Sequence, residues 1–582
     1  MPEIHYQLIN TSEDLSCALA LLSEQESIGI DTETTGLDPF NSRIRLIQLG
    51  TAEQAFIIDL FRTPAFAAAL KPLLTAARPS KVFHNAKFDL KMISHHLGFE
   101  VNSIFDTMLA SQLISCGREE DNHSLLSAAA RFLNIEIDKS QQLSNWGSEL
   151  TESQLRYAAY DAIVVLALQQ AEQIRLRELG LVETAELEFA AVAPIAAMEL
   201  TGMLLDAARW RTHLEVIEQK HKELAVQLQQ ALEPGCLQMN LFGEARINLD
   251  SPAQVLDALQ RMGIPILGTR SVQLQALARE YPIIELLLEY RSLQKALSSY
   301  GEGMLKFIHP VTGRIHADFR QIGTPTGRLA CHEPNLQQIP HTADYRSCFL
   351  AAPGKQLIIA DYSQIELRIL ADWSCDSVLI EALRSGADLH RVTASQMFGV
   401  PLNDITNEHR AAAKQLNYGI VYGMGAQGLA NRVHSSLREA ERLIERYFST
   451  YAGVAKWLQI AGERAVAARQ TRTRLGRLMQ ISYDEADPSS VAAAVRLGKN
   501  MPIQGTSADI TKRAMMRLYR ALAGSSAQLV NNVHDEFVIE VGSEQAEEIA
   551  AEVQRQMVAA GAEFIASVPV TVDIKVAKTW QK

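Results

Sequence analysis

Cysteine is scarce in this sequence, and no two cysteines are spaced as a CxxC pair. The six that occur are Cys17, Cys116, Cys236, Cys331, Cys348 and Cys375. A scattered set of this kind is typical of buried thiols in a reducing compartment. No apolar run reaches the roughly 18 residues that cross a membrane, and the first residues lack the basic and apolar segments of a signal peptide. These absences exclude a disulfide scaffold and a membrane partner, and we expect a cytoplasmic protein.

The sequence also lacks an excess of positive charge. Its 55 Lys and Arg residues face 67 Asp and Glu residues, which gives a net charge of −12 and argues mildly against nucleic-acid binding. The arginines are unevenly spread, however, because the stretch 461–480 has five of them and a single acid, Glu463. They are Arg464, Arg469, Arg472, Arg474 and Arg477. Such a stretch either tracks phosphate groups or forms a solvated helix face.

Length and composition indicate a multidomain globular protein. A chain of 582 residues exceeds the roughly 250–300 residues at which single hydrophobic cores stop growing. Hydrophobic residues make up 47% of the chain, which is ordinary for a globular protein, and no low-complexity tract occurs. We therefore expect several domains.

A strand followed by a carboxylate stands out near the middle of the chain. Leu357–Ala360 is a short apolar run typical of a buried strand, and Asp361 follows it directly. Because an unpaired buried carboxylate is costly, we expect a cation beside it. A second acid, Asp535, lies in the turn between strands that we predict at 529–533 and 537–541. Two rigidly held aspartates can bind two divalent ions, an arrangement that drives in-line displacement at phosphorus.

Residues 1–185 are predicted to form one α/β unit with acids of its own. Asp31 and Glu33 point to the same face of a predicted strand, and Asp89 lies in the first turn of a following helix. A capping-box pattern at Thr151 starts a long helix that we expect to reach about residue 178. This helix places Tyr157 and Asp161 on one face. The four carboxylates and the tyrosine are either a metal site or scattered surface acids, and each acid alone is typical of a surface position.

These motifs together resemble those of family A DNA polymerases. The motifs are Asp361–Glu366, the helix that carries Arg410, Lys414 and Tyr418, and the segment His534–Glu536. The resemblance covers nearly the whole chain and has the extent of a Klenow-like large fragment. It implies an α/β multidomain protein in which a ribonuclease H-like 3′–5′ exonuclease domain precedes a right-hand polymerase. Because the chain begins about thirty residues before Asp31, we expect no 5′-nuclease domain.

The resemblance also implies domain boundaries. We expect the exonuclease domain at 1–185 and the polymerase domain at 186–582. Within the polymerase we expect the thumb at about 207–300, the palm at about 311–383 and 455–582, and the fingers at about 384–454. The thumb is compact and shows no insertion that would recruit a processivity factor.

Two metal sites follow from the same resemblance. In the exonuclease, Asp31, Glu33, Asp89 and Asp161 would hold two divalent ions, and Tyr157 would orient the attacking water. In the polymerase, Asp361 and Asp535 would hold two, with the Tyr362 carbonyl as a further ligand. Glu536 neighbours these ligands as a catalytic or supporting acid. Mg²⁺ suits both sites, with Mn²⁺ as a substitute, because it takes carboxylates together with substrate phosphates.

The nucleotide-binding residues implied by the resemblance are Gln364, Glu366, His390, Arg410, Lys414 and Tyr418. Arg410, Lys414, Tyr418 and Tyr422 recur every four residues, so they drift by only ~40° per step around a helix and line one face. Lys414 would also give a proton to the leaving pyrophosphate. Glu366 would exclude ribonucleotides, and the Tyr418 hydroxyl would permit dideoxynucleotides. The family's basic residue after Pro340 is absent, so Arg346 or His390 is expected to replace its triphosphate contact.

The expected partners are primer–template DNA and deoxynucleoside triphosphates, bound by a monomer in the bacterial nucleoid or, for a phage enzyme, the host cytoplasm. The DNA-contacting residues are expected to be Arg328, Asn335, Tyr422, Arg496, Asn500, Gln504 and His534. Those that reach the minor groove would check base-pair shape rather than sequence. Two alternatives remain open, a single-subunit RNA polymerase and a non-catalytic DNA-binding descendant.

Overall fold

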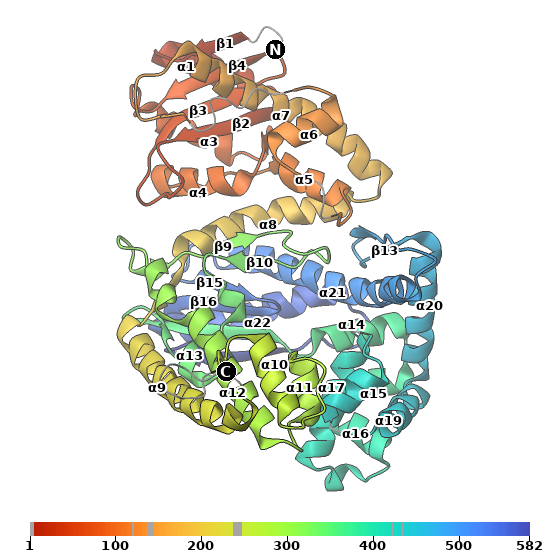
Figure 1. Ribbon diagram of the computed structural model, residues 1–582. Helices are drawn as coiled ribbons and strands as arrows, with labels where there is room; N and C mark the ends of the chain where they lie inside the picture. The colour runs from red at the N-terminus through yellow and green to blue at the C-terminus, as the bar shows by residue number, and fades with distance from the viewer. Residues whose placement is uncertain are drawn as a thin grey trace.

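The computed structural model of the protein describes residues 5–118, 122–136, 144–236, 247–421, 423–433 and 435–581. Figure 1 shows an N-terminal body at the top and a larger body below, with helix α8 (Val182–Thr201) running between them. Among the residues so described, no helix is long and apolar enough to cross a membrane.

The N-terminal body is built on a six-stranded mixed sheet in the order β1-β4-β3-β2-β5-β6. Its strands are β1 (His5–Leu8), β2 (Ser27–Thr34), β3 (Ile44–Gly50), β4 (Gln54–Asp59), β5 (Ser80–Phe83) and β6 (Ile104–Asp106). Its helices are α1 (Ser12–Ser23), α2 (Phe66–Ala69), α3 (Lys71–Thr75), α4 (Ala86–Leu97), α5 (Thr107–Ile114), α6 (Leu125–Leu133) and α7 (Glu152–Glu178). The α/β unit expected from the sequence is therefore present.

Helix α7 lies directly on the sheet because two glycines leave room for it. A Cβ atom at Gly29 or at Gly50 would come within 1.8 or 2.4 Å of the Ala162 carbonyl oxygen of α7. The predicted capping box begins this helix. The Gln154 amide accepts from the Thr151 N–H at 2.9 Å, and the Thr151 hydroxyl accepts from the Gln154 N–H at 3.3 Å. The prediction of a long helix that ends at 178 is confirmed.

Helix α8 contributes to two hydrophobic cores. Ala185 and Phe189 pack in the core of the N-terminal body, whereas Ile195 and Met198 pack in the core of the larger body. The boundary predicted near residue 185 therefore falls inside a helix.

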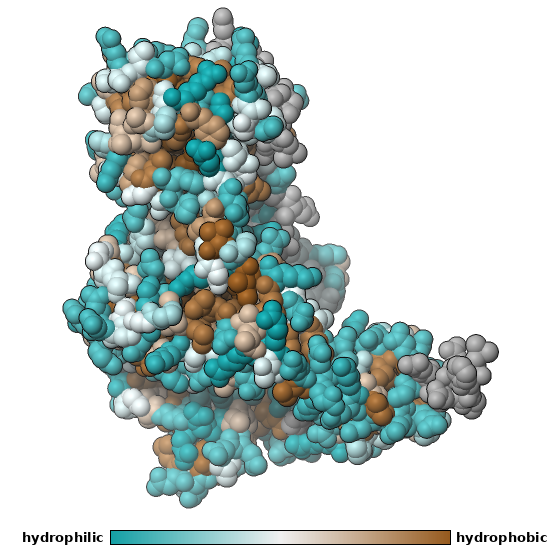
Figure 2. All heavy atoms as spheres, turned by 90° about the vertical axis from the view of Figure 1, so that its left-hand side faces the viewer, coloured by the Kyte–Doolittle hydropathy of each residue, from teal (hydrophilic) through white to brown (hydrophobic). Residues whose placement is uncertain are grey.

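The thumb region is a group of helices with its own small core. They are α9 (Ala207–Leu232), α10 (Pro252–Arg261), α11 (Ser271–Leu277) and α12 (Pro282–Tyr300), and short 3-10 turns follow α9 at Glu233–Gly235 and α12 at Glu302–Phe307. The core joins Leu228 of α9 to Leu259 of α10 and Leu287 of α12. Figure 2 shows these helices as a largely hydrophilic arm that projects to the lower right of the body.

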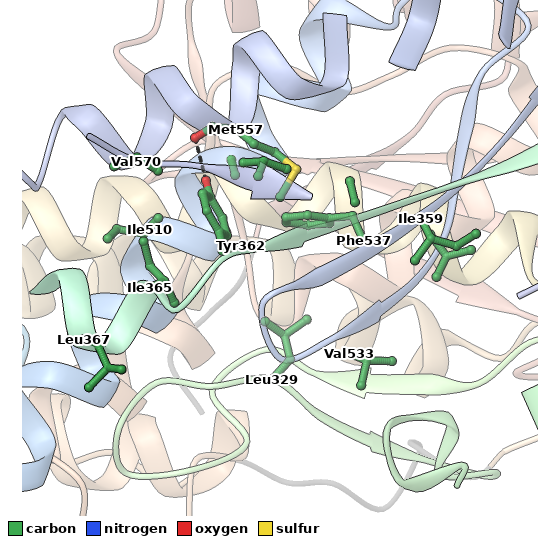
Figure 3. Packing of buried hydrophobic residues seen from close by; sticks show 14 of the residues in the cluster. Leu329, Ile359, Tyr362, Ile365, Leu367, Ile510, Val533, Phe537, Met557 and Val570 are labelled. Atoms are coloured by element: carbon green, nitrogen blue, oxygen red, sulfur yellow. Dashed lines mark hydrogen bonds between the residues drawn. The ribbon is translucent and has the colours of Figure 1, made fainter. Parts of the chain in front are cut away.

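The palm is a four-stranded antiparallel sheet in the order β15-β16-β12-β17. Its strands are β12 (Lys355–Tyr362), β15 (Gln528–Val533), β16 (Glu536–Gly542) and β17 (Val572–Ala577). Helices α14 (Ile365–Ser374), α21 (Pro488–Ala521) and α22 (Ala546–Ala562) accompany them. In Figure 3 the Tyr362 ring points into this core beside Phe537, and its hydroxyl donates to the Met557 carbonyl at 2.7 Å. The two predicted strands around Asp535 are confirmed, while β12 runs two residues beyond Ala360.

The fingers are helical. They contain α16 (Leu389–Phe398), α17 (Asn407–Val421), α18 (Ala426–Val433) and α19 (Leu437–Thr450), with a 3-10 turn at Leu402–Asp404, and α15 (Ser377–Arg384) and α20 (Ala452–Ala468) flank them. The remaining elements are β7 (Met203–Leu205), β8 (Arg314–Ile315), β9 (Asp318–Arg320), β10 (Ala330–His332), α13 (Ala343–Arg346), β11 (Phe349–Leu350), β13 (Gln470–Arg472) and β14 (Leu478–Gln480). The helix predicted from Asn407 is confirmed.

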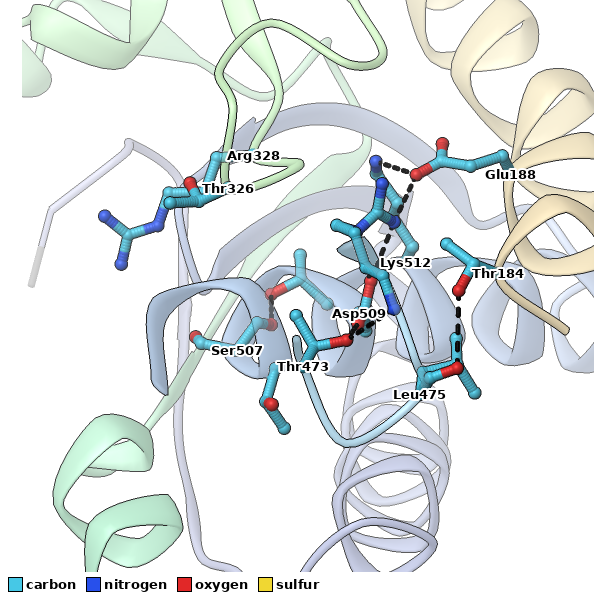
Figure 4. A network of polar contacts seen from close by, with 12 residues as sticks. Thr184, Glu188, Thr326, Arg328, Thr473, Leu475, Ser507, Asp509 and Lys512 are labelled. Carbon is cyan, nitrogen blue, oxygen red and sulfur yellow. Dashed lines mark hydrogen bonds and ion pairs between the residues drawn. The ribbon is translucent and has the colours of Figure 1, made fainter. Parts of the chain in front are cut away.

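The arginine-rich stretch forms mostly structural contacts. Arg477 lies buried in the β13–β14 hairpin and pairs with Glu188 of α8 and with Asp509 of α21, the latter at 2.7 Å. Figure 4 shows Glu188, Asp509 and Lys512 of this polar network. Arg474 pairs with Asp372 at 2.6 Å. The remaining contacts are those of Arg472 to the Leu179 and Gly476 carbonyls and of Arg469 to Glu485. Of the five arginines, only Arg464 lies on an exposed helix face, so neither sequence interpretation describes the stretch as a whole.

Candidate active sites

A cavity of about 540 Å³ opens between the palm strands and the fingers helices. Most residues predicted for the polymerase site line it. They are Arg328, Asp361, Tyr362, Gln364, Glu366, His390, Arg410, Lys414, Tyr418, His534 and Asp535. One side carries the carboxylates and the facing side carries the cations of α17, an arrangement that suits a metal-bound polyphosphate.

The sheet register brings Asp361 and Asp535 together. Asp361 in β12 pairs with Glu536 in β16, so Asp535 lies one residue away in the β15–β16 turn. The Tyr362 N–H donates to the Asp535 carbonyl at 3.4 Å. Burial, and next the charge of Asp361, raise the pKa of Asp535 to about 7. His534 in the same turn has φ of +59°, a left-handed conformation uncommon for a residue other than glycine.

The donor set at this turn fits Mg²⁺. Burial and the charge of Asp361 raise the proton affinity of Asp535, and a divalent cation between the two carboxylates would stabilise the charged form. Because the Tyr362 side chain is turned into the core, its main chain faces the cavity. Within the described ranges, no three or more His, Cys, Asp or Glu side chains are placed so that together they could hold a metal ion. An open site with few protein ligands is typical of Mg²⁺ that also binds substrate phosphates.

Glu366 lies at the start of α14 and is nearly buried. The Arg328 guanidinium forms an ion pair with its carboxylate, and both residues line the cavity. The ion pair with Arg328 holds the Glu366 side chain in the cavity, where the sugar of the incoming nucleotide is expected from the sequence.

Asp388 is a site residue that the sequence interpretation missed. Its carboxylate caps α16 by accepting the His390 and Arg391 N–H groups at 3.0 and 3.2 Å. The other oxygen accepts from Arg410 Nε at 2.6 Å. Arg410 is therefore held through Nε, and it lines the cavity. An aspartate directly before a helix is a capping signal that could have identified this residue.

Asn417 was also missed, although it lies on α17 between Lys414 and Tyr418. Its Nδ2 donates to His390 Nδ1 at 3.0 Å, and Asn417 itself is 1% exposed. Because Nδ1 accepts, the His390 proton lies on Nε2. Burial, opposed by Asp388 and assisted by Arg410 and Lys414, lowers the pKa of His390 to about 4. His390 therefore presents a neutral N–H donor to the cavity.

The structure places Arg346 and Glu536 away from the cavity. Arg346 is 1% exposed, donates to Glu536 Oε1 at 3.0 Å and stacks on the Trp580 ring at 4.1 Å. Trp580 Nε1 also donates to Glu536, at 2.8 Å. Of the two residues expected to replace the missing triphosphate contact, the prediction for Arg346 is thus corrected, because Glu536 neutralises its charge inside the protein, whereas His390 lines the cavity. The Glu536 carboxylate holds Arg346 and Trp580 in place rather than lining the cavity.

The other predicted DNA contacts lie outside this cavity. Asn335 caps the short turn Leu336–Gln338, where its side chain accepts the Gln337 N–H at 3.1 Å. Arg496, Asn500 and Gln504 all lie on α21, and Arg496 packs against Gly423 beyond the end of α17. Tyr422 lies outside the described residues. In contrast, Asp573 lines the cavity and pairs in register with Asp361, although no motif or spacing in the sequence singles it out.

A second acidic site lies where α7 crosses β2. Asp31 and Glu33 are on the β2 face that α7 covers, and Tyr157 and Asp161 face them from α7. Burial, then the charge and hydrogen bond of Asp161, then Glu33 and Asp31 raise the pKa of Tyr157. These four predicted residues are therefore neighbours. Their carboxylates are the ligand type that Mg²⁺ prefers.

Asp89 approaches the same strand from the other side. Its Oδ1 accepts from the Thr32 hydroxyl at 2.6 Å, and Thr32 alternates with Asp31 and Glu33 along β2. Burial raises the pKa of Asp89 to about 7, although the Thr32 hydrogen bond opposes the shift. Asp89 is thus linked to the acidic site through Thr32.

Comparisons with known proteins agree with this geometry. Residues 214–582 match DNA polymerase family A, and residues 6–175 match a 3′–5′ exonuclease family. The chain is 32% identical to DNA polymerase I of Aquifex aeolicus, over 99% of this chain and 100% of that protein. It is also 32% identical to DNA polymerase I of Pseudomonas aeruginosa, over 100% of this chain and 66% of that protein. It thus spans about two thirds of the latter.

Among solved structures, the chain is similar to one described as the POL domain of Pol1 from M. smegmatis in complex with DNA primer-template and dNTP. The TM-score is 0.87, the sequence identity is 28%, and the match covers 99% of each chain.

Proposed function

The chain belongs to DNA polymerase family A and carries a 3′–5′ exonuclease domain, and we propose that it copies a DNA template by extending a primer and removes mispaired 3′ ends. The observation that carries the proposal is the cavity in which Asp361 and Asp535 face Arg410 and Lys414.

In the polymerase site, the two aspartates would hold Mg²⁺, which when bound lowers the pKa of the primer 3′-OH and neutralises phosphate charge. Arg410 and Lys414 bind the triphosphate, and Lys414 also donates a proton to the leaving pyrophosphate. His390 donates its Nε2 proton to a phosphate oxygen. Lysine and arginine suit triphosphate binding because proteins recognise phosphate by its charge and with multiple N–H donors.

Two further residues select the sugar. Glu366, fixed by Arg328, crowds a ribose 2′-OH and so favours deoxynucleotides. Tyr418 lies beside His390, with ring centroids 5.7 Å apart, and faces the sugar with its hydroxyl. When a dideoxynucleotide lacks its 3′-OH, the Tyr418 hydroxyl, which can both donate and accept, makes the hydrogen bond that the missing group would have made.

In the nuclease site, Asp31, Glu33, Asp89 and Asp161 would hold Mg²⁺, and Asp89 also accepts from the Thr32 hydroxyl. Tyr157 orients the attacking water, since its O–H donates to the Asp161 carboxylate and its oxygen can accept a hydrogen bond from the water. Mn²⁺ substitutes for Mg²⁺ at both sites, because both prefer oxygen ligands.

The proposed partners are primer–template DNA and deoxynucleoside triphosphates, and the similar solved structure from M. smegmatis is a complex with ligands of these two kinds. Arg328 and His534 reach DNA from the cavity, and Asn335, Arg496, Asn500 and Gln504 from the elements around it. The protein acts as a cytoplasmic monomer without a processivity factor bound to the thumb.

The test is extension of a primer with a mismatched 3′ end, with and without Mg²⁺, by wild type and by Asp535→Asn and Asp31→Asn variants. We expect the first variant to trim the mismatch without extending and the second to extend matched primers without trimming. Extension by Asp535→Asn at the wild-type rate would refute the polymerase assignment, and trimming by Asp31→Asn would refute the nuclease assignment. Preference for ribonucleotides in the same assay would indicate an RNA polymerase instead.

A further inference from the structure

Gln48 lies directly across the sheet from a predicted metal ligand of the nuclease site. In the antiparallel pairing of β2 with β3, Asp31 is opposite Gln48, and Glu33 is opposite Leu46. Side chains opposite each other in such a pair are on the same face, with Cβ atoms about 4.5–5.5 Å apart. Gln48 therefore shares with Asp31 the face that α7 covers.

The Gln48 amide has no hydrogen-bond partner among the residues that the structure describes. The residue is 0% exposed, and neither Nε2 nor Oε1 finds a donor or acceptor within those ranges. Its neighbours on that face are apolar, because Ile57 of β4 is opposite Gln48 and Leu46 is two residues along β3, and both belong to one hydrophobic cluster with Trp146 and Tyr157. Burying an unsatisfied amide lowers stability, and an apolar side chain of the same length would avoid that penalty. Stability alone therefore does not explain a glutamine here.

Among the described residues, few polar groups of the nuclease site are within reach of the Gln48 amide. Tyr157 is in the same cluster, but its hydroxyl is hydrogen-bonded to Asp161. Glu33 is the diagonal neighbour across the strand pair, at about 7–8 Å. Bulk water does not reach a fully buried side chain. Asp31, the direct neighbour, is the carboxylate that Gln48 can support.

We propose that Gln48 is a positioning residue of the nuclease site, whose amide Nε2 donates to the Asp31 carboxylate when that carboxylate takes up metal and the 3′-terminal nucleotide. The proposal rests on the nuclease function proposed above. The hydrogen bond holds Asp31 in its ligating orientation. The Gln48 amide therefore lacks a hydrogen bond in the free protein and gains one when metal and the nucleotide are bound. A side chain that lowers stability but supports activity is common at functional sites.

The test compares full-length wild type with Gln48→Met, which keeps the length of the side chain and removes the amide. Leu46→Met on the same strand face is the matched control, since swaps between leucine and methionine are well tolerated. Three quantities are measured: trimming of a single-stranded 3′ end against Mg²⁺ concentration, primer extension, and hydrogen exchange of the β2 and β3 amides without metal. For Gln48→Met we expect on the order of tenfold slower trimming and a several-fold higher half-saturating Mg²⁺ concentration. Extension should be unchanged, and strand exchange unchanged or slower.

The outcomes separate the claims. Unchanged trimming and Mg²⁺ dependence in Gln48→Met would overturn the inference, as would slower trimming with faster strand exchange, which marks a structural role. A reduction of the same size in Leu46→Met would also overturn it. If wild type itself never trims a 3′ end, the proposed nuclease function fails, whatever Gln48 does.

Discussion

Replacing Arg477 by methionine should destabilise the polymerase body by about 3–5 kcal/mol, the usual effect of removing one partner from a buried ion pair. Arg477 is 2% exposed and donates to Asp509 Oδ1 from Nε at 2.9 Å and from Nη2 at 2.7 Å. It also pairs with Glu188, which in turn pairs with Lys512 at 2.5 Å. The wild-type cluster has two cations and two anions, so the variant leaves a buried net charge of −1.

The magnitude can be checked against a control from the same stretch. Arg469 pairs with Glu485 at 2.6 Å, but their side chains are 49% and 74% exposed. Such exposed pairs contribute at most about 1 kcal/mol, so Arg469→Met should be nearly neutral. Urea unfolding followed by tryptophan fluorescence should show a midpoint lowered by roughly 1 M for Arg477→Met, if m is about 3–5 kcal/mol/M for a unit of this size.

A second variant tests the physical cause. Adding Glu188→Gln to Arg477→Met restores charge neutrality in the cluster, so the double variant should recover at least about 1 kcal/mol. A midpoint for Arg477→Met no lower than that of Arg469→Met would refute the reasoning. A double variant less stable than the single one would show that lost hydrogen bonds, rather than charge, set the effect.

Three further predictions concern the cavity. Glu366→Ala should reduce the preference for deoxynucleotides on the order of 10- to 100-fold, measured as a ratio of kcat/KM values, and an unchanged ratio would rule out its part in sugar selection. Tyr418→Phe should discriminate more strongly against dideoxynucleotides, and equal incorporation ratios in both enzymes would contradict the assigned contact. Asn417→Asp should raise the pKa of His390 from about 4 toward or above its usual value, because a carboxylate favours imidazolium. KM for the nucleotide should then fall as pH falls from 8 to 5, whereas a profile as flat as that of wild type would exclude this role for Asn417.

Much of the site could be predicted because local patterns determine it. A strand that ends in an acid, as at Asp361, fixes a carboxylate at the edge of a sheet, and a tight turn does the same for Asp535. Residues four apart on a helix share a face, so Arg410, Lys414 and Tyr418 reach one cavity. The placement of each residue on its element needs only the periods of helix and strand, whereas the joining of these elements into one site was implied by the resemblance to family A polymerases.

The residues that were misjudged depend on tertiary pairing. Arg346 was one of two residues expected to contact the triphosphate, the other being His390, but Glu536 and Trp580 bury its guanidinium. Gln48 and Asp573 were not selected, because their places opposite Asp31 and Asp361 follow from strand register. Sequence periodicity predicts which face of a strand a residue occupies but not which residue lies opposite it on the next strand. The ion pair of Arg346 and the strand register of Gln48 and Asp573 therefore could not be predicted.

The domain boundary was hard to place for a physical reason of its own. Proline- and glycine-rich linkers mark a boundary only where few contacts cross it, and here a continuous helix lies between the bodies. Besides its apolar residues in both cores, α8 carries Glu199, whose carboxylate accepts from Lys87 and Lys91 of α4 at 2.6 and 2.7 Å. Those lysines flank Asp89 on the same helix. Because buried charge and apolar packing both hold α4 against α8, the two bodies share a structural element, and no single residue divides them.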